Sequence, residues 1–324
     1  MGGDRGPEEV VAGALAAATD RLKPVLVGPA GLDTQGLELI EAPDVIDMDD
    51  KPTDAVRAKP NSSLVVACRA VPEGKADAVI SAGNTGAMLA ACLVELRRLP
   101  GVKRPAIAVT LPARRGPVVL IDSGANADAR PEHLLQFGQM GAVFAEEILG
   151  TANPEVRLLS IGEEPEKGSL MVLEAHALLA ASSLNFGGNT EGRDLLVGGA
   201  DVVVTDGFTG NVVLKLLEGT ISNLLEAFRE EVTATATGKL GGLLIRPAGR
   251  RLRDRLDPDT YGGGYLLGLR GLAVIAHGNS SSKAIANAIR LAALGVEHDV
   301  VGRLAQRVGE SVLASRPSTT PTPT

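Results

Sequence analysis

The chain has 324 residues, of which 44% are hydrophobic, enough to bury one large core or two linked ones. Aromatic residues make up only 2%, Trp is absent, and the formal net charge is -7 at pH 7. This composition argues against nucleic-acid binding by base stacking and against a general polyanion-binding surface, so we expect no nucleic-acid partner.

Cysteine usage and hydropathy indicate a protein of the cytoplasm. Cys68 and Cys92 fit neither a disulfide framework nor a metal-binding spacing, which favours two buried thiols in a reducing compartment. No apolar run approaches the roughly 20 residues that a membrane span needs, and the N-terminus lacks the layout of a signal peptide. Residues 315–324, rich in Pro, Thr and Ser, are predicted to be a disordered tail, which leaves residues 1–314 as a single α/β domain.

Short apolar blocks rich in β-branched residues alternate with longer helical patterns along the chain. The blocks predict strands within residues 23–28, 76–83, 105–112, 117–126, 155–164, 200–207 and 272–278. Helical spacing of apolar residues predicts helices within 85–99, 130–149 and 280–295. Continuous apolar strands separated by helices are typical of a parallel sheet covered on both faces. We therefore predict a three-layer α/β/α sandwich with an open, mostly parallel sheet.

Two segments of the chain are similar to each other. Residues 76–93 and 200–217 both begin with Ala-Asp, continue as a buried strand, and pass through a turn containing Thr-Gly into a helix. The similarity predicts two equivalent turns at the carboxyl edge of one sheet, which is where open α/β sheets bind ligands.

These turns carry small polar groups at the start of helices. At Thr85-Gly86 and Thr209-Gly210, free backbone N–H groups, a hydroxyl and the positive helix end together favour a small anion. For a single turn, a helix cap or a left-handed glycine is the better explanation. Because the segments 122–126 and 160–168 end strands in the same manner, their convergence favours an anion site.

The familiar motifs for nucleotide binding and for a protein nucleophile are incomplete. The chain has no complete phosphate-binding loop or dinucleotide fingerprint, and no Ser, Cys and His form a recognisable triad. Inorganic phosphate can itself attack an activated carbonyl when it is held and aligned, and positioning contributes roughly 7 to 11 kcal/mol to lowering such a barrier. The side chains of Asn, Thr and Lys, and the backbone N–H groups that Gly leaves accessible, can hold and align phosphate in this way.

Six motifs occur in an order that spans nearly the whole chain. They are MGGDRGP (1–7), SAGNTGA (81–87), DSGAN (122–126), IGEEPEKG (161–168), DGFTGN (206–211) and GLRGLAVIAHG (268–278). In this order they resemble the phosphate acyltransferases of bacterial phospholipid synthesis. The resemblance implies transfer of a fatty acyl group from acyl carrier protein to inorganic phosphate, giving acyl phosphate, with no metal and no organic cofactor.

The resemblance also implies a fold and partners. It implies a homodimer whose fold is similar to phosphotransacetylases and isopropylmalate-type dehydrogenases. It further implies that a membrane-embedded acyltransferase uses the product to acylate glycerol 3-phosphate. Family members carry a short strand before the first motif, whereas this sequence begins inside that motif. The first strand of the sheet is therefore either missing or misannotated, and the positions of Gly2, Gly3 and Asp4 stay open.

The motifs assign candidate site residues as well. By resemblance, Lys167 is the cation that pairs with phosphate or the carbonyl oxyanion, and Asn211 orients phosphate. A solvated loop lysine that pairs with Glu163, Glu164 or Glu166 is the more common fate of such a residue, and only the motif favours the catalytic role. The other substrate-binding residues that the motifs imply are Gly83, Asn84, Thr85, Gly86, Asn126, Thr209 and Gly210.

Acidic residues and two further side chains complete the candidate site. Because like charges repel, the carboxylates cannot all face a bound dianion, and we expect most of them to orient Lys167, Arg57 or backbone amides. These carboxylates are Asp4, Asp122, Glu163, Glu164 and Asp206. Arg57 is either a contact for phosphate or acyl carrier protein or an exposed surface arginine. His277 has either a structural hydrogen bond or a role in acid catalysis.

A helical arm is predicted over about residues 212–262. Its segment 238–256 holds six basic residues and one acidic residue, with Leu and Ile side chains beside them. Such a layout suits the surface of an anionic bilayer, and a solvated arm or a dimer contact explains it equally well. By resemblance, the arm is a helical hairpin that projects from the dimer and touches the membrane or the acidic acyl carrier protein.

Two other functions stay open at this point. A dehydrogenase of the isopropylmalate type is disfavoured because the sequence has no dinucleotide fingerprint and no clustered carboxylates for a metal. A non-catalytic scaffold that is recruited to membranes has only the basic arm in its support.

Overall fold

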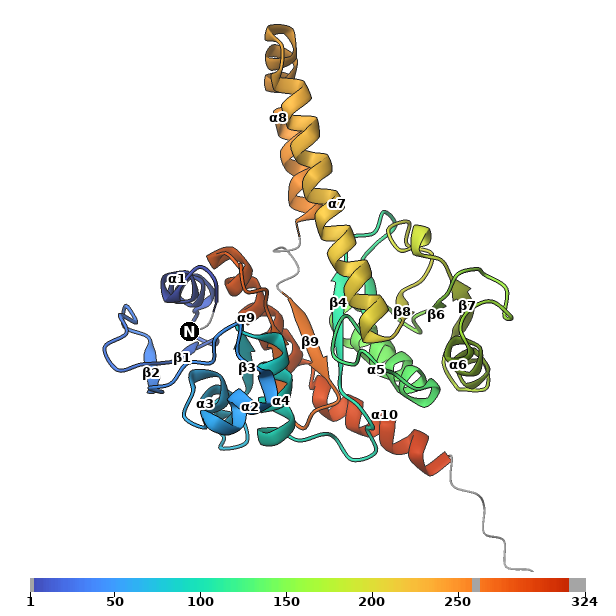
Figure 1. Cartoon of the computed structure of the whole chain (residues 1–324), viewed down its shortest axis with the longest axis horizontal. Coiled ribbons are helices and arrows are strands. Elements are labelled where there is room, and N and C mark those ends of the chain that lie inside the picture. Colours follow the sequence, from blue (N-terminus) through green and yellow to red (C-terminus); the bar gives the residue numbers. More distant parts are fainter. Residues whose placement is uncertain (1–2, 258–262, 315–324) are drawn as a thin grey trace, which may run out of the picture.

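A mixed sheet of eight strands forms the centre of the computed structural model, which describes residues 3–257 and 263–314 (Figure 1). The strand order is β3-β10-β9-β4-β5-β8-β6-β7. In that order the strands are β3 (Ala78–Ser81), β10 (Leu272–Ile275), β9 (Gly264–Leu267), β4 (Ala106–Leu111), β5 (Val118–Ile121), β8 (Val202–Val204), β6 (Val156–Leu159) and β7 (Phe186–Thr190). The expected α/β architecture with a mostly parallel sheet is confirmed.

The two halves of this sheet run in opposite directions. β3 is parallel to β10, and β5, β8, β6 and β7 are parallel to one another, but the pairings β10-β9, β9-β4 and β4-β5 are all antiparallel. Because strand direction reverses at three successive pairings, β5, β8, β6 and β7 run opposite to β3 and β10. The expectation of two equivalent turns at one edge of the sheet is therefore wrong, because β3 and β8 point in opposite directions.

The register nevertheless brings both sets of carboxyl ends together. Val274 pairs with Tyr265, Tyr265 with Ala108, Ala108 with Ile121, and Ile121 with Val204, so these residues form one row across the sheet. β5 and β8 end on this row, and β10 ends one residue beyond it. The loops that leave both halves consequently meet near the middle of β4.

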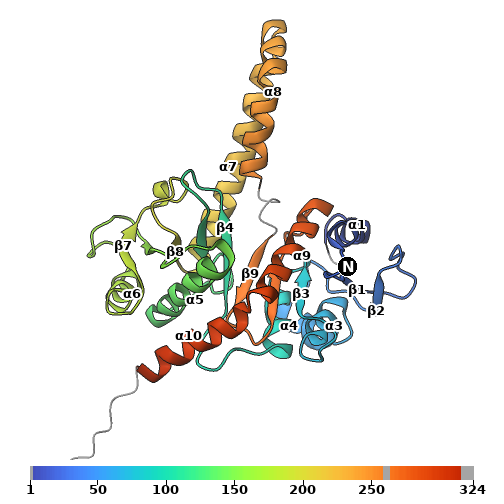
Figure 2. The same cartoon turned by 180° about the vertical axis from the view of Figure 1, so that it is seen from behind.

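Helices cover both faces of the sheet. α5 (Pro131–Leu149), α9 (Ser282–Glu297) and α10 (Val300–Ala314) pack on one face, as Figure 2 shows from behind, and α1 (Pro7–Ala17) lies against α9. This face carries the largest core, in which Phe144 meets Tyr265 edge to face with ring centroids 5.0 Å apart. α6 (Leu170–Ala180) packs beside α5.

The opposite face has two separate apolar clusters. One lies under α3 (Ser63–Ala70) and α4 (Thr85–Glu95), with the short α2 (Pro52–Ala58) packed beside α4. It contains Cys68 and Cys92, which are free, buried thiols as expected. The other cluster lies under the first turns of α7 (Gly207–Thr233). Val109 of β4 contacts both clusters, so the middle of β4 lies between them.

Several predicted boundaries need correction. The block 23–28 contains β1 (Val25–Gly28), but β1 pairs only with β2 (Glu38–Glu41) in a separate two-stranded sheet. β2, β7 and β9 were not predicted, since each is short and β7 reads FGGNT, with two glycines that weaken a strand pattern. A 3₁₀ turn, Gly192–Asp194, follows β7. The tail 315–324 lies outside the described residues.

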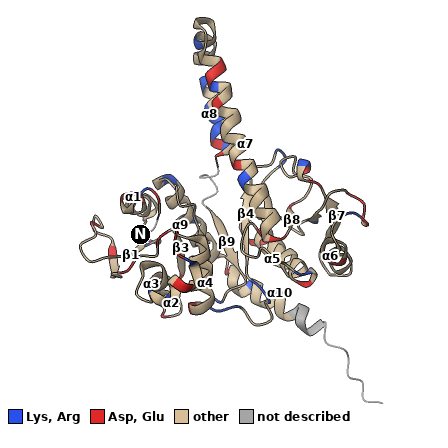
Figure 3. Ribbon diagram, in the orientation of Figure 1, with Lys and Arg blue, Asp and Glu red and all other residues tan. Residues whose placement is uncertain are grey.

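The arm is a helical hairpin, as the resemblance implies. α7 and α8 (Ala236–Leu256) pack against each other and project from the body (Figure 1). α7 begins at Gly207 and not near 212, because the Asp206 carboxylate caps the helix by accepting a hydrogen bond from the Thr209 N–H at 2.9 Å. Lys and Arg residues are concentrated on α8 (Figure 3). No helix within the described ranges is both long and apolar enough to cross a bilayer.

Candidate active site

A cavity of about 350 Å³ opens between the two apolar clusters, beside the middle of β4. Its polar end is formed by Thr85, Gly86, Ser123, Gly124, Asn211, Lys215, Glu218 and His277. Its apolar wall includes Val109 and Leu111 of β4, and Leu214, Leu217 and Ile221 of α7. The cavity is therefore formed jointly by the first turn of α4, the loop after β5, the start of α7 and the end of β10.

Asp122 shapes the loop 122–126. Its carboxylate is fully buried and accepts hydrogen bonds from the backbone N–H groups of Ile107 (3.1 Å), Ala125 (2.8 Å) and Asn126 (2.9 Å), and from the Asn126 side chain (2.8 Å). Burial raises the pKa of Asp122 above its ordinary value, although these donors oppose the rise. Asp122 thus supports the cavity from behind and does not face it.

Two glycines let α7 approach this loop. A Cβ atom on Gly207 would lie 2.7 Å from both the backbone N and O of Asn126, and one on Gly210 would overlap the carbonyl oxygen of Asp122. Only glycine permits this backbone contact without a shift of the helix. Gly210 is therefore a packing residue, and it fixes the position of Asn211 next to Gly124.

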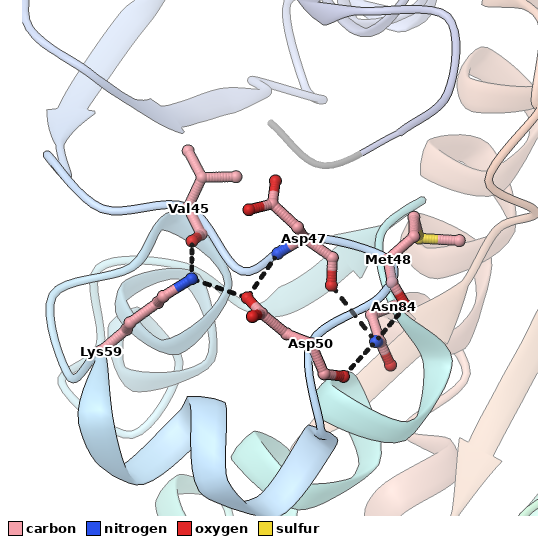
Figure 4. A network of polar contacts seen from close by, with 6 residues as sticks. All are labelled: Val45, Asp47, Met48, Asp50, Lys59 and Asn84. Atoms are coloured by element: carbon pink, nitrogen blue, oxygen red, sulfur yellow. Dashed lines mark hydrogen bonds and ion pairs between the residues drawn. The ribbon is translucent and has the colours of Figure 1, made fainter.

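Three expected phosphate donors have structural partners instead. The Asn84 side chain caps α4 by accepting from the Ala87 N–H at 3.0 Å, and its amide nitrogen donates to the carbonyls of Met48 (3.0 Å) and Asp50 (3.2 Å) (Figure 4). The Asn126 amide donates to Asp122 and to the Pro105 carbonyl. The third, the Thr209 hydroxyl, donates to the Asp206 carboxylate at 2.7 Å. Their side-chain N–H and O–H groups are occupied, so we correct their assignment to supporting residues.

The loop held by Asn84 has a second anchor. Lys59 reaches the Asp50 carboxylate at 2.6 Å and the Val45 carbonyl at 2.9 Å (Figure 4). The hydrogen bond from Lys59 lowers the pKa of Asp50. Pro52 follows directly and would contact a Cβ atom on Gly86, so this loop packs against the start of α4. Gly83 is buried beside it, with its N–H bonded to the Ser81 hydroxyl at 3.1 Å.

Four other predicted residues lie outside the cavity. Lys167, Glu163 and Glu164 are exposed in the loop after β6, and Arg57 is exposed on α2. Lys167 takes part in none of the ion pairs found in residues 3–257 and 263–314, so the expected alternative of pairing with a neighbouring glutamate is not seen there either. β6 is the sheet neighbour of β8, which places this loop one strand away from the one leading to Asn211.

The structure adds two residues that sequence reasoning missed. Glu218 lies between Lys215, with Nζ 3.1 Å from Oε2, and His277, with Nε2 2.9 Å from Oε1. Burial opposes ionisation of Glu218, but its contacts with His277 and Lys215 outweigh that effect and lower its pKa. Asn211, Lys215 and Glu218 are four and three residues apart, a spacing that places them on one helix face. This spacing is the feature of the sequence from which Lys215 and Glu218 could have been predicted.

No group of three or more His, Cys, Asp or Glu side chains within the described part of the chain is arranged to hold a metal ion. The polar end of the cavity instead offers a lysine and a histidine that both contact the Glu218 carboxylate, neutral side chains and the first turn of a helix. Together with the apolar wall, this arrangement suits a ligand that has a small anionic end and an apolar body.

Comparison with known proteins agrees with this arrangement. A family model described as fatty acid synthesis protein matches residues 1–303. The phosphate acyltransferase of Heliobacterium modesticaldum is 45% identical over 320 residues, covering 95% of this chain and 96% of its own. That of Desulfitobacterium hafniense is 47% identical over 308 residues, covering 92% of each chain.

Among solved structures, a branched-chain phosphotransacylase from Enterococcus faecalis has a similar fold. It aligns with a TM-score of 0.58 at 19% identity and covers 92% of this chain and 97% of its own. The expected phosphotransacetylase-like fold is therefore confirmed. These relatives decide against the dehydrogenase and scaffold alternatives. The chain belongs to the fatty acid synthesis protein family and, like its phosphate acyltransferase relatives, is an acyltransferase.

Proposed function

We propose that the protein transfers a long-chain fatty acyl group from acyl carrier protein to inorganic phosphate, and that the acyl phosphate formed serves phosphatidic acid synthesis. The observation that carries this proposal is the cavity, which joins a polar end at the first turn of α4 to an apolar wall from β4 and α7. Phosphate and the thioester fit the polar end, and the first carbons of an acyl chain fit the wall.

The proposed phosphate site uses groups that are still available for a ligand. Thr85 and Asn211 line the cavity, and neither side chain has a hydrogen bond within the described part of the chain. Gly86 adds a backbone N–H in the first turn of α4, where the helix dipole favours an anion. Lys215 lines the same end, with its ammonium paired to Glu218.

In this mechanism phosphate is the nucleophile. One of its oxygen atoms attacks the thioester carbonyl, the carbon–oxygen bond forms, and the carbon–sulfur bond then breaks. Alignment of phosphate by Asn211 and Thr85 supplies the positioning contribution, and donors near the carbonyl oxygen stabilise the negative charge that develops there. The chain contributes orientation and electrostatics, and it forms no covalent bond to the acyl group.

The direct test is detection of the product. Wild-type protein is incubated with palmitoyl-acyl carrier protein and phosphate, and all protein, including the unreacted donor, is then removed because hydroxylamine also cleaves thioesters. The protein-free extract is treated with hydroxylamine, and palmitoyl hydroxamate is measured by mass spectrometry. We expect hydroxamate only when protein, donor and phosphate are all present. Equal amounts without phosphate would refute the proposed reaction.

Lys167 is proposed as a second cation for the transferred phosphate or the oxyanion. Lys167→Ala is expected to lower kcat about 100-fold, the scale of losing one charge-stabilising donor. Because Lys167 is exposed and outside the cavity, its removal should leave the melting temperature unchanged. Lys23→Ala removes another exposed loop lysine as the control. A near-normal kcat for Lys167→Ala would eliminate this role.

We further propose that the arm attaches the protein to the cytoplasmic side of an anionic membrane. Leu243, Leu244 and Ile245 of α8 are 63%, 77% and 46% exposed, on a helix rich in Arg. Replacing all three with Ser is expected to reduce cosedimentation with anionic vesicles several-fold while activity in solution stays largely intact. The control replaces Val94 and Val296, exposed apolar residues on the body, with Ser. Unchanged sedimentation of the arm variant would remove the membrane role.

A homodimer is proposed from the family resemblance. In its support, α7 exposes Phe208, Leu216, Leu224 and Phe228 with between 56% and 68% of each side chain accessible, and a single chain leaves them uncovered. Membrane attachment would also bring the product close to the proposed user of acyl phosphate, a membrane glycerol-3-phosphate acyltransferase. Light scattering measures the oligomeric state directly.

A further inference from the structure

The titratable side chains that line the cavity form a single cluster. Among the described residues, these are Lys215, Glu218 and His277. Glu218 joins the other two through its separate carboxylate oxygens, at 3.1 Å from Lys215 Nζ and 2.9 Å from His277 Nε2. His277 and Glu218 come from different elements, since one follows β10 and the other lies on α7. The contact therefore links the segment after β10 to α7 at the polar end of the cavity.

The proposed reaction requires one proton to move. Hydrogen phosphate loses its proton when it becomes the acyl phosphate dianion, and the departing sulfur gains a proton when it leaves as a thiol. These two changes balance, so no net proton is taken from solvent. A group that accepts the first proton and delivers the second completes the reaction.

The proton is needed most at the sulfur atom of the thioester. A tetrahedral intermediate that carries both a phosphate and a thiolate leaving group tends to expel phosphate, because phosphate is the weaker base. The intermediate then returns to reactants. Protonation of sulfur as the carbon–sulfur bond breaks makes departure of the thiol competitive, which is the usual role of a general acid.

We propose that His277 is this proton carrier and that Glu218 is the residue that positions it, an inference that rests on the proposed acyl transfer. His277 Nε2 lies 2.9 Å from Glu218 Oε1, an ion-pair contact whose angle does not make a hydrogen bond, and Nδ1 has no carboxylate contact in the described chain. The Nδ1 proton passes to sulfur, the electron pair of the carbon–sulfur bond stays on sulfur, and the neutral imidazole takes up the proton that phosphate releases.

Two charged side chains line the cavity together with His277. Glu218 contacts His277 directly, and the lowered pKa of Glu218 keeps that carboxylate ionised at neutral pH. The Lys215 ammonium contacts the other oxygen of the Glu218 carboxylate. Asp4 of the N-terminal segment lies next to Gly278, the residue that follows His277, since a Cβ atom on Gly278 would be 2.9 Å from an Asp4 carboxylate oxygen.

The test measures kcat/KM against pH for palmitoyl-acyl carrier protein. Wild-type activity should fall at alkaline pH, because a general acid must be protonated to act. His277→Gln should lower the neutral rate by about 100-fold or more and remove the alkaline fall. Glu218→Gln, which keeps the side-chain shape, should lower the neutral rate less than His277→Gln does, because it removes only the group that positions the imidazole.

A second measurement separates acid catalysis from a structural role. The palmitoyl thioester of 4-nitrothiophenol has a leaving group that departs readily without a proton, so His277→Gln should slow its phosphorolysis far less than that of palmitoyl-acyl carrier protein. An equal loss with both donors, or an alkaline fall that persists unchanged in His277→Gln, would overturn the proposal. His298→Gln is the matched control, since it removes the histidine of another His–Glu contact, 3.9 Å from Glu147 and away from the cavity.

Failure of the proposed function gives a different result. In that case the wild-type protein makes no palmitoyl hydroxamate from palmitoyl-acyl carrier protein and phosphate. If hydroxamate forms normally and the pH profile of His277→Gln matches that of wild type, only the role of His277 is refuted.

Discussion

Asn211→Ala is expected to lower kcat at least about 100-fold, equivalent to roughly 2.7 to 4 kcal/mol of transition-state stabilisation. Asn211 lines the cavity on the first turns of α7, beside Gly124, and its exposed amide has no hydrogen bond within the described chain. The lost interaction is therefore one with substrate and not one that holds the fold. Steady-state kinetics with saturating phosphate distinguish a fall in kcat from a rise in KM.

Asn223→Ala is a matched control for this variant. Asn223 is also exposed on α7, more than three turns from Asn211 and outside the cavity, so the same substitution there changes helix propensity but no substrate contact. We expect near-wild-type kinetics for this control and similar melting temperatures for both variants. A normal kcat in a folded Asn211→Ala protein would contradict the proposed phosphate site.

Asp122→Ala is expected to have the largest effect on stability, about 3 to 5 kcal/mol in the free energy of unfolding. The substitution leaves the backbone N–H groups of Ile107, Ala125 and Asn126 and the Asn126 amide without their acceptor in a buried site. Urea unfolding measures the loss. Asp128→Ala, an exposed carboxylate just after the same loop, should change stability by less than about 0.5 kcal/mol. Equal stability of the two variants would refute the structural assignment of Asp122.

Asp122 also makes the stability of the protein depend on pH. Because burial raises the pKa of Asp122 above its ordinary 3.8, the folded chain holds more protons than the unfolded chain in the window between these two values. The contribution of Asp122 to stability therefore falls as the pH rises through that window. Asp122→Asn should lack this component, which a series of unfolding curves against pH would reveal.

The sequence was sufficient for the fold class, the family and the position of the main turns. Apolar strands followed by helical patterns identify an α/β protein, and the motif at 206–211 places Asn211 at the start of a helix. These features are local, because a strand, a turn and the first helical residues are adjacent in the chain. Local patterns of this kind survive in a single sequence.

The direction and pairing of strands could not be predicted in the same way. Nothing within the apolar blocks indicates that three antiparallel pairings occur in succession, or that β1 pairs with β2 and not with the main sheet. These choices depend on contacts between residues far apart in the chain. The shared register row, which explains why the turns converge, becomes visible only when the pairings are known.

The same limit applies to the role of individual polar residues. Asn84, Asn126 and Asn211 all lie in motifs, and the sequence alone treats them as equivalent amide donors. The structure separates them by their partners, since the first two have occupied amides and the third does not. Glu218 was missed because an acidic residue on an arm helix is usually solvated, and only its proximity to His277 distinguishes it.

The length of α7 has a consequence for how the enzyme would meet its surroundings. One uninterrupted helix links Asn211 to Thr233, and at 1.5 Å per residue it separates them by about 33 Å. A chain anchored through the far end of that helix would hold its reaction centre well clear of the lipid headgroups. Attachment at the tip of the arm and binding of substrate at the cavity would then take place at separate parts of the molecule.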